Sequence, residues 1–165
     1  MLTPAQQATL KTYIEANPTW MAYPHNSDGA FQIASDLQDD SNPVYTVWRT
    51  SVLEDEITGN TSAEGTDWSW PDYIGLTVGE QGGYIRMFRA GSVDASKANV
   101  RQGFIDIFNG PGGADQRTHM AAISKRTANL LEELFATGTG STASPGTMAV
   151  EGSVGYREIL QVMGW

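Results

Sequence analysis

A stripe of mainly apolar residues recurs at steps of three and four along residues 114–135, the longest stretch of the chain with a single helical pattern. Its members are Met120, Ile123, Thr127, Leu130, Leu131 and Leu134. Arg117, Lys125 and Arg126 fall outside the stripe, where they can stay hydrated. Neither glycine nor proline interrupts the pattern for about six turns. The sequence therefore predicts a long central helix on which the other elements pack.

Five shorter helices are expected around the central one. The first has three start signals: Thr3 as a capping residue, Pro4 at the first helical position and Gln6 in the spacing of a capping box. It should end near Ala16, because Asn17 precedes a proline and is therefore disfavoured in helical backbone. The other four are expected from Ser27 to about Leu37, from Ser51 through Ile57, from Thr77 through Phe88, and over residues 97–108. Ser51 with Glu54, and Thr77 with Glu80, stand in the spacing of a capping box.

Extended structure is expected at two places. Residues 44–48, VYTVW, are rich in β-branched and aromatic side chains. Further along, Met148, Val150, Val154 and Tyr156 alternate with small or polar residues, which indicates one or two short strands. The predicted fold class is mainly α: a small helical bundle of about five helices around a long central helix, with an extended C-terminal arm that carries one or two short β-strands.

The chain is expected to divide into a helical bundle domain, residues 1–136, and a flexible low-complexity linker with a C-terminal docking arm, residues 137–165. Residues 136–147, ATGTGSTASPGT, hold no side chain large enough to support a core. The apolar end that follows either returns to its own domain or docks onto a neighbouring chain. In the docking case the contact residues are Met148, Val150, Tyr156, Ile159, Leu160 and Trp165, and removing the arm would leave the bundle folded.

The composition indicates one soluble globular domain. The 165 residues are 40% hydrophobic and 10% aromatic, which suits a real core and argues against wholesale disorder. The chain has no cysteine, which excludes disulfides and thiolate metal sites. No apolar stretch approaches the roughly 20 residues of a membrane span. We therefore expect a protein made in the cytoplasm, with no membrane partner.

The formal charge of −9 is unevenly distributed along the chain. Residues 28–80 hold eleven acidic residues against Arg49 alone, whereas residues 81–126 hold seven basic residues against three acidic ones. The simpler interpretation is that these charges hydrate loops and helix ends. The alternative is a head-to-tail contact between copies of the chain. Its pairs would join Glu54, Asp55 and Glu56 of one copy with Arg86, Arg89 or Arg101 of the next.

Trp68 and Trp70 lie among carboxylates, a combination that also occurs in sugar-binding sites. Two tryptophans next to a proline are more typical of a core or a subunit interface, where large aromatics provide much of the buried area. We therefore place both in the interface set. The enzyme alternative is a carbohydrate-active hydrolase that uses these tryptophans with Glu64 and Asp67.

Recognisable catalytic motifs are missing from the sequence. His25 and His119 are the only histidines, and neither stands in a zinc-binding, triad or calcium-loop pattern. The glycine-rich run from Gly138 lacks the lysine of a phosphate-binding loop. Basic residues are too few and too dispersed for a nucleic-acid footprint. We expect no enzyme activity, no metal and no cofactor.

Five stretches of the chain are distinctive: LTPAQQATLKTYI, NSDGAFQIASDLQ, VYTVWRTSVLEDEI, NVRQGFIDIF and LFATGTGSTASPGTMAVEGSVGY. They resemble a family of small proteins encoded among the structural genes of tailed bacteriophages and prophages. The resemblance covers essentially the whole chain and does not rest on a catalytic motif.

This resemblance implies a non-enzymatic virion protein, most similar to the head-to-tail adaptors, or connectors, of the phage neck. Such a protein forms a homo-oligomeric ring below the portal protein, contacts tail or nozzle proteins, and lets the genomic DNA pass without sequence-specific binding. It is made in the bacterial cytoplasm and ends in the virion. The alternative within the same class is a capsid decoration or other virion assembly protein.

Overall fold

The computed structural model describes residues 1–62 and 65–165. Half of the chain is helical, with ten helices and six short strands in the described residues. The prediction of a mainly helical fold is therefore confirmed. Several of these helices span only one or two turns, so the bundle has more and shorter helices than the expected five.

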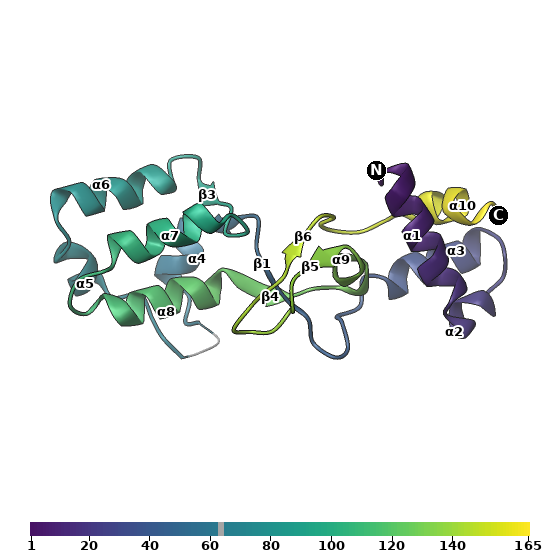
Figure 1. Ribbon diagram of the computed structural model, residues 1–165, viewed down its shortest axis with the longest axis horizontal. Coiled ribbons are helices and arrows are strands. Elements are labelled where there is room, and N and C mark those ends of the chain that lie inside the picture. The colour runs from purple at the N-terminus through teal and green to yellow at the C-terminus, as the bar shows by residue number, and fades with distance from the viewer. Residues whose placement is uncertain (63–64) are drawn as a thin grey trace. The chain divides into compact units, whose positions relative to one another are not determined.

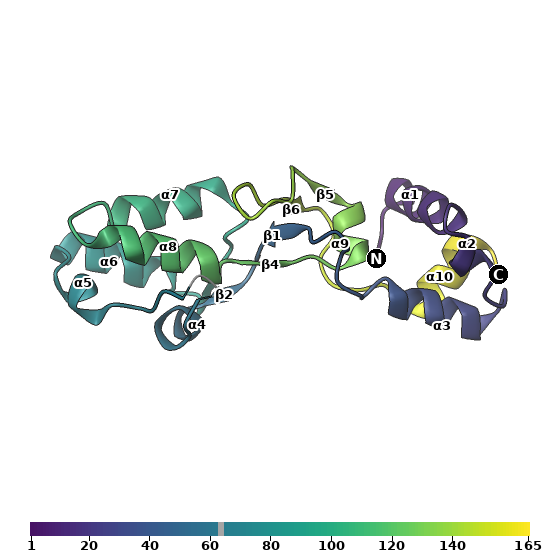
Figure 2. The ribbon, with the colours of Figure 1, turned by 90° about the horizontal axis from the view of Figure 1, so that it is seen from below.

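The chain forms two compact units, drawn in Figures 1 and 2. Unit 1 consists of Met1–Thr46 together with Thr127–Trp165, and unit 2 is the intervening segment Val47–Arg126. The chain crosses between them along β1 (Thr46–Trp48) and β4 (Lys125–Thr127), which pair with each other. The boundary expected at residue 137 falls inside unit 1.

Unit 1 contains five helices and one hairpin. The helices are α1 (Pro4–Glu15), α2 (Pro18–Met21), α3 (Ser27–Asp36), α9 (Leu130–Leu134) and α10 (Tyr156–Met163). The capping box predicted for α1 is present: the Gln6 amide donates to the Thr3 hydroxyl at 3.3 Å, and the Thr3 amide donates to Gln6 Oε1 at 2.9 Å. The helix predicted from Ser27 is also confirmed, with Asn26 as its capping residue.

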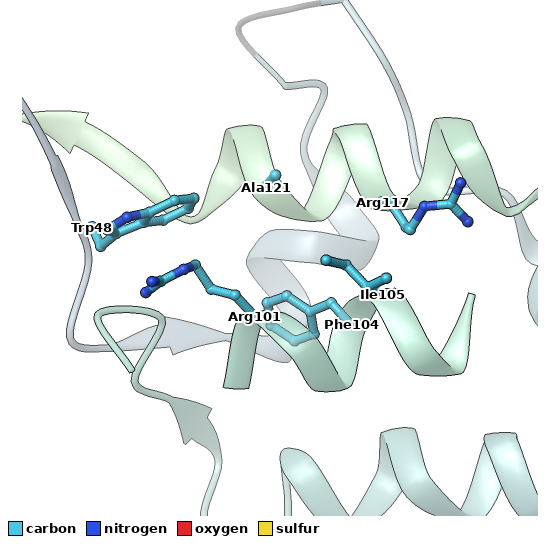
Figure 3. Close-up of a pocket in the computed structure, with 6 residues that line it drawn as sticks. All are labelled: Trp48, Arg101, Phe104, Ile105, Arg117 and Ala121. Carbon is cyan, nitrogen blue, oxygen red and sulfur yellow. The ribbon is translucent and has the colours of Figure 1, made fainter. Parts of the chain in front are cut away.

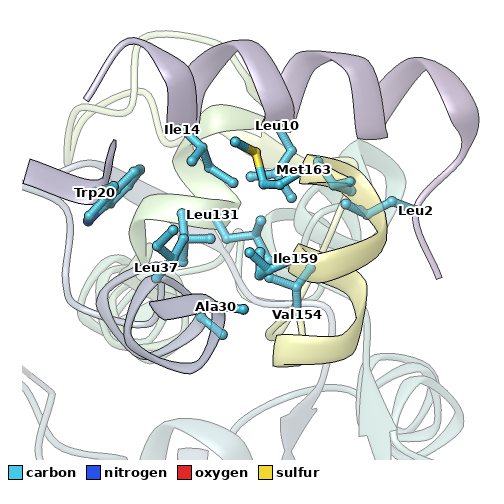
Figure 4. Close-up of a cluster of buried hydrophobic side chains, with 13 residues drawn as sticks. Leu2, Leu10, Ile14, Trp20, Ala30, Leu37, Leu131, Val154, Ile159 and Met163 are labelled. Carbon is cyan, nitrogen blue, oxygen red and sulfur yellow. The ribbon is translucent and has the colours of Figure 1, made fainter. Parts of the chain in front are cut away.

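The core of unit 1 lies between α1, α3, α9 and α10 (Figure 4). Ile159 of α10 is fully buried against side chains of the other helices, among them Leu10, Ala30 and Leu131. Of the two destinations expected for the apolar C-terminal end, the structure therefore has the first: the end returns to its own unit. Tyr156 begins this helix and does not lie in a strand.

A hairpin of unit 1 takes the place of the expected flexible linker. Its strands, β5 (Ala136–Thr137) and β6 (Thr147–Met148), are antiparallel. The loop between them is attached to the first residue of β1, since the Thr46 amide donates to Gly140 O at 2.6 Å and Thr46 O accepts from the Gly146 amide at 2.8 Å. The Tyr45 hydroxyl adds a hydrogen bond to Gly138 O at 2.9 Å. The small residues of this stretch thus allow the loop to enclose an aromatic ring.

The described residues of unit 2 form five helices and a two-stranded sheet. The helices are α4 (Glu54–Gly59), α5 (Trp70–Ile74), α6 (Val78–Met87), α7 (Ala98–Ile107) and α8 (Gly113–Ile123); the strands are β2 (Val52–Leu53) and β3 (Ser92–Val93). Its core is aromatic: Trp68, Tyr84 and Phe108 are mutually in ring contact, and Phe88 extends the cluster to Phe104.

Two of the three helices expected in this segment begin and end close to the predicted residues. The Thr77–Glu80 capping box of α6 is present, and α7 lies within residues 97–108. The short helix α4 exists, but its expected cap at Ser51 is wrong. Leu53 occupies the cap position, and the Glu56 carboxylate accepts the Leu53 amide at 2.9 Å.

The prediction of a long central helix over residues 114–135 is wrong. α8 ends at Ile123, the backbone is extended through β4, and α9 begins after Asn129. Asn129 and Glu132 form a capping box. The Glu132 amide donates a hydrogen bond to Asn129 Oδ1 at 2.8 Å, and the Asn129 amide donates one to Glu132 Oε2 at 3.1 Å. This local signal starts a new helix and overrides the continuous stripe.

The two ends of that stripe belong to different cores. Met120 is fully buried in unit 2, whereas Leu131 is fully buried in unit 1. The apolar period therefore continues in the sequence across a point where the chain leaves one unit and enters the other.

Candidate functional site

An apolar slot opens on unit 2 between α7 and α8 (Figure 3). It has a volume of about 230 Å³ and is lined by Trp48, Arg101, Phe104, Ile105, Arg117 and Ala121. Phe104 and Ile105 come from α7 and Ala121 from α8, while the arginines stand toward the two ends of the row. We call this cavity the basic slot, because apolar atoms form its interior and guanidinium groups flank it.

The charges beside the basic slot are held in place by the fold. Arg101 Nη1 donates to Ala95 O and Ser96 O, both at 2.7 Å, and its guanidinium carbon lies 4.6 Å from the centroid of the Trp48 ring. Lys125 Nζ lies 5.6 Å from the same ring. Arg117 donates to Phe108 O. These contacts are to carbonyls and to a ring, so they position the positive charges without neutralising them.

A second hollow on unit 2 has the opposite charge. It has a volume of about 410 Å³ and is lined by Glu54, Asp55, Thr58, Trp70 and Gly91. The Trp70 ring packs edge-on against Trp68 at 5.7 Å between centroids, yet 54% of Trp70 is exposed. We call this surface the acidic tryptophan patch. It combines a large ring supported from below with two carboxylates.

Neither surface holds an ion pair in the part of the chain that the structure describes. The ion pairs among residues 1–62 and 65–165 include Lys11 with Glu15, Arg49 with Glu56, and Lys97 with Asp94. The carboxylates of Glu54 and Asp55 and the guanidinium groups of Arg101 and Arg117 are in none of these pairs. Each surface is therefore available to a partner of opposite charge.

Glu56 has a different role from its two acidic neighbours. Its carboxylate accepts the Leu53 amide at 2.9 Å and contacts Arg49 Nη2 at 2.7 and 2.9 Å. The hydrogen bond from Leu53, and after it the bond and charge of Arg49, hold the pKa of Glu56 below its ordinary value of 4.5. Glu56, which the sequence placed in the contact set, is thus engaged inside unit 2.

Replacing Glu56 should reveal this engagement as a pH dependence. A carboxyl whose folded pKa is lowered adds stability that is present above its unfolded pKa and is lost as the pH falls through the folded pKa. Glu56→Gln should therefore destabilise unit 2 by roughly 1–2 kcal/mol at pH 7 and by less below about pH 4. Urea unfolding at both pH values measures this difference.

Asp67→Asn is the matched control, because Asp67 is exposed and forms no ion pair in the described part of the chain. This variant should stay within about 0.5 kcal/mol of the wild type at both pH values. An equal loss of stability for Glu56→Gln at both pH values would contradict the role given to the ionised carboxylate.

The other residues of the expected contact set are distributed over both units. Arg86 and Arg89 are exposed at the end of α6, apart from the basic slot that holds Arg101. Trp68 is buried in the core, where it cannot stack on a sugar. Glu64, which the hydrolase alternative uses, lies outside the described residues. In unit 1, Met148, Val150, Leu160 and Trp165 are half-buried, Tyr156 is exposed and Ile159 is buried.

Only Arg101 of the basic slot was expected from the sequence, and five other residues escaped the sequence analysis: Trp48, Phe104, Ile105, Arg117 and Ala121. The only local signal was on α7, where Arg101 and Ile105 are four residues apart and lie off the buried face of Phe104 and Ile107. The position of Trp48 depends on the pairing of β1 with β4, which the sequence did not indicate.

The histidines have structural surroundings. His119 is fully buried, with Nδ1 2.8 Å from Thr66 O and Nε2 2.6 Å from Ile57 O, so it connects α8 with α4 and the following loop. His25 stacks on Trp165 at 4.4 Å between ring centroids. Within the described residues, no group of three or more histidine, aspartate or glutamate side chains is arranged to hold a metal ion.

None of the helices in the described ranges has the length and apolar character that a bilayer crossing requires. No protein-family model, curated protein or solved structure matches this chain.

Proposed function

We propose that this chain is a non-enzymatic structural protein of a tailed-phage virion, the head-to-tail adaptor that forms a homo-oligomeric ring between the portal and the tail. The sequence resemblance to phage structural proteins supports the class. The structural observation that supports a ring is the pair of unlike surfaces on unit 2, the basic slot and the acidic tryptophan patch.

The two surfaces belong to different helices of unit 2. In Figure 2, α7 and α4 lie on opposite sides of the unit, with α8 between them. The basic slot lies at α7 and α8, and the acidic tryptophan patch includes Glu54 and Asp55 of α4. A contact between unlike faces of identical copies is heterologous, and it closes into a ring when the rotation between neighbours divides a full turn.

The charge of the chain suits a component through which DNA passes. A net charge of −9 repels phosphate over distances up to about a Debye length, so the genome can slide through a ring without adhering to it. The partners of this ring are further copies of the chain, the portal protein, and the tail or nozzle proteins. The proposal includes no cofactor, no metal and no membrane contact.

A nonsense mutation in the gene tests the proposal in a phage that carries it. We expect DNA-filled heads and complete tails that accumulate separately, because an adaptor is needed to join them. Adding the purified chain to this lysate should restore infectious particles. Electron microscopy of the lysate, with a plaque assay before and after addition, measures both effects.

The same experiment separates the alternatives. A capsid decoration protein would give tailed particles whose heads are less stable to heat or osmotic shock. A hydrolase would give tailed particles that fail to degrade the cell wall. Either result would contradict the adaptor assignment.

A further inference from the structure

The basic slot and the acidic tryptophan patch are complementary in shape and charge. We propose that Trp70 of one copy inserts into the basic slot of the next copy, so that Glu54 and Asp55 face the positive charges beside it. This inference rests on the proposed function, since it identifies the contact that builds the ring.

The size of the slot suits one aromatic side chain. A cavity of about 150 Å³ lined by apolar side chains accommodates benzene, and the slot provides about 230 Å³. Its walls include the rings of Trp48 and Phe104. An indole between these walls would make ring contacts of the kind that stabilise aromatic pairs.

Trp70 is well prepared to act as an anchor. Its ring already packs edge-on against Trp68 and Tyr73, at 5.7 and 5.8 Å between centroids. The ring therefore loses little conformational freedom when it is buried by a partner. Tryptophans that fill a pocket at the centre of an interface are among the residues with the largest effect on affinity.

The flanking charges distinguish Trp70 from Ile85, another exposed apolar side chain of unit 2. Ile85 is slightly more exposed, at 59%, but it lies next to Arg86 near the end of α6. A contact of that face with the basic slot would bring positive charges together, which is unfavourable. When Trp70 enters the basic slot of the next copy, the carboxylates beside it, those of Glu54 and Asp55, face the guanidinium groups of that slot.

Trp70 does not occupy the slot of its own chain. Both surfaces belong to one compact unit, and no residue lines both of them. Each copy therefore offers one anchor and one slot, and binding leaves one of each free at the ends of any open chain of copies. Such an arrangement continues until the ring closes.

Two variants test the contact separately. Trp70→Ala removes the anchor and leaves the slot open, whereas Ala121→Trp fills the slot with a side chain of its own and leaves the anchor in place. Each is expected to weaken self-association of the full chain by about 30-fold or more, the effect of losing an interface hot spot. Sedimentation velocity over a concentration series measures it. Val78→Ala, which shortens a more exposed apolar residue, should associate as the wild type does.

Mixing the two variants provides the sharpest outcome. An Ala121→Trp copy can offer its Trp70 to the open slot of a Trp70→Ala copy, but no second contact of this kind remains. The mixture should therefore form dimers of one copy of each, and nothing larger, while each variant alone stays monomeric. Circular dichroism of each variant confirms that it is folded before mixing.

The results that overturn the inference differ from those that overturn the proposed function. A wild-type chain that stays monomeric at about 1 mM, or rings that persist in both variants, would exclude the Trp70 contact. Rings of unchanged affinity in both variants would still leave an adaptor built on another surface. Conversely, mixed dimers as expected, together with tailed particles from the nonsense mutant, would keep the contact and remove the adaptor role.

Discussion

A chain that lacks residues 156–165 should fail to fold unit 1 while unit 2 stays folded. These residues include α10, whose Ile159 is fully buried with Val162 and Met163 in the core of unit 1. The Glu158 carboxylate also accepts the Leu2 amide at 2.9 Å, so the helix fixes the start of the chain as well. This expectation reverses the one drawn from the sequence, in which removing residues 137–165 left the helical bundle intact.

The single substitution Ile159→Ala makes this prediction quantitative. Truncating a fully buried isoleucine should cost about 2–5 kcal/mol, from lost burial and from the cavity left behind. Urea unfolding followed by hydrogen exchange of unit 1 amides measures the change and assigns it to that unit. Gln161→Ala is the control on the same helix, because Gln161 is exposed. It should stay within about 0.5 kcal/mol of the wild type.

An unchanged unfolding of unit 1 in the shortened chain would contradict the packing of α10. The docking alternative for the C-terminal end would then regain its place. The shortened chain should also expose the apolar residues of α1 and α3, so increased binding of an apolar dye is a second readout.

Gly140→Ala should destabilise unit 1 by about 2–5 kcal/mol. Gly140 has φ +65°, a left-handed conformation that costs a residue with a side chain about 1–2 kcal/mol. A Cβ at this position would also overlap the Tyr45 ring, and overpacking of this kind costs a further 1–3 kcal/mol or so. Thermal or urea unfolding measures the total.

Two further variants separate the backbone cost from the clash. Gly164 has φ +73°, and a Cβ added there would meet no other atom within 4 Å, so Gly164→Ala should show the backbone cost alone. Combining Gly140→Ala with Tyr45→Ala should recover part of the loss, because the ring that the Cβ meets is gone. Equal costs for the two single variants, with no recovery in the double variant, would show that the loop does not enclose the ring.

Local capping signals predicted two helix starts correctly and one, at Ser51, wrongly. The helix starts at Thr3 and Thr77 could be predicted because a capping box satisfies backbone amides within four residues of sequence. Its partners are Gln6 in the first helix and Glu80 in the second. The same signal at Asn129 and Glu132 lies inside the long apolar stripe and was not used in the sequence analysis. A periodic pattern does not reveal that Met120 and Leu131 face different cores, because this depends on where the chain passes between the units.

The candidate site was predictable only in part. Glu54, Asp55 and Trp70 are close in the sequence to other acidic and aromatic residues, and the structure brings them together in one patch. The basic slot instead joins Trp48 with residues more than fifty positions later in the chain. Such a cavity depends on tertiary packing. Neither the charge pattern nor the apolar period of the sequence indicates which distant residues will meet there.

The division of the chain also implies an order of folding during synthesis. Unit 2 is one continuous segment, whereas unit 1 combines Met1–Thr46 with Thr127–Trp165. Domains fold as units once their residues have left the ribosome, so unit 2 can form while α1 and α3 still wait for α10. A ribosome that stalls before Ile159 releases a chain with an incomplete unit 1, which cellular proteases can remove before it joins an assembly.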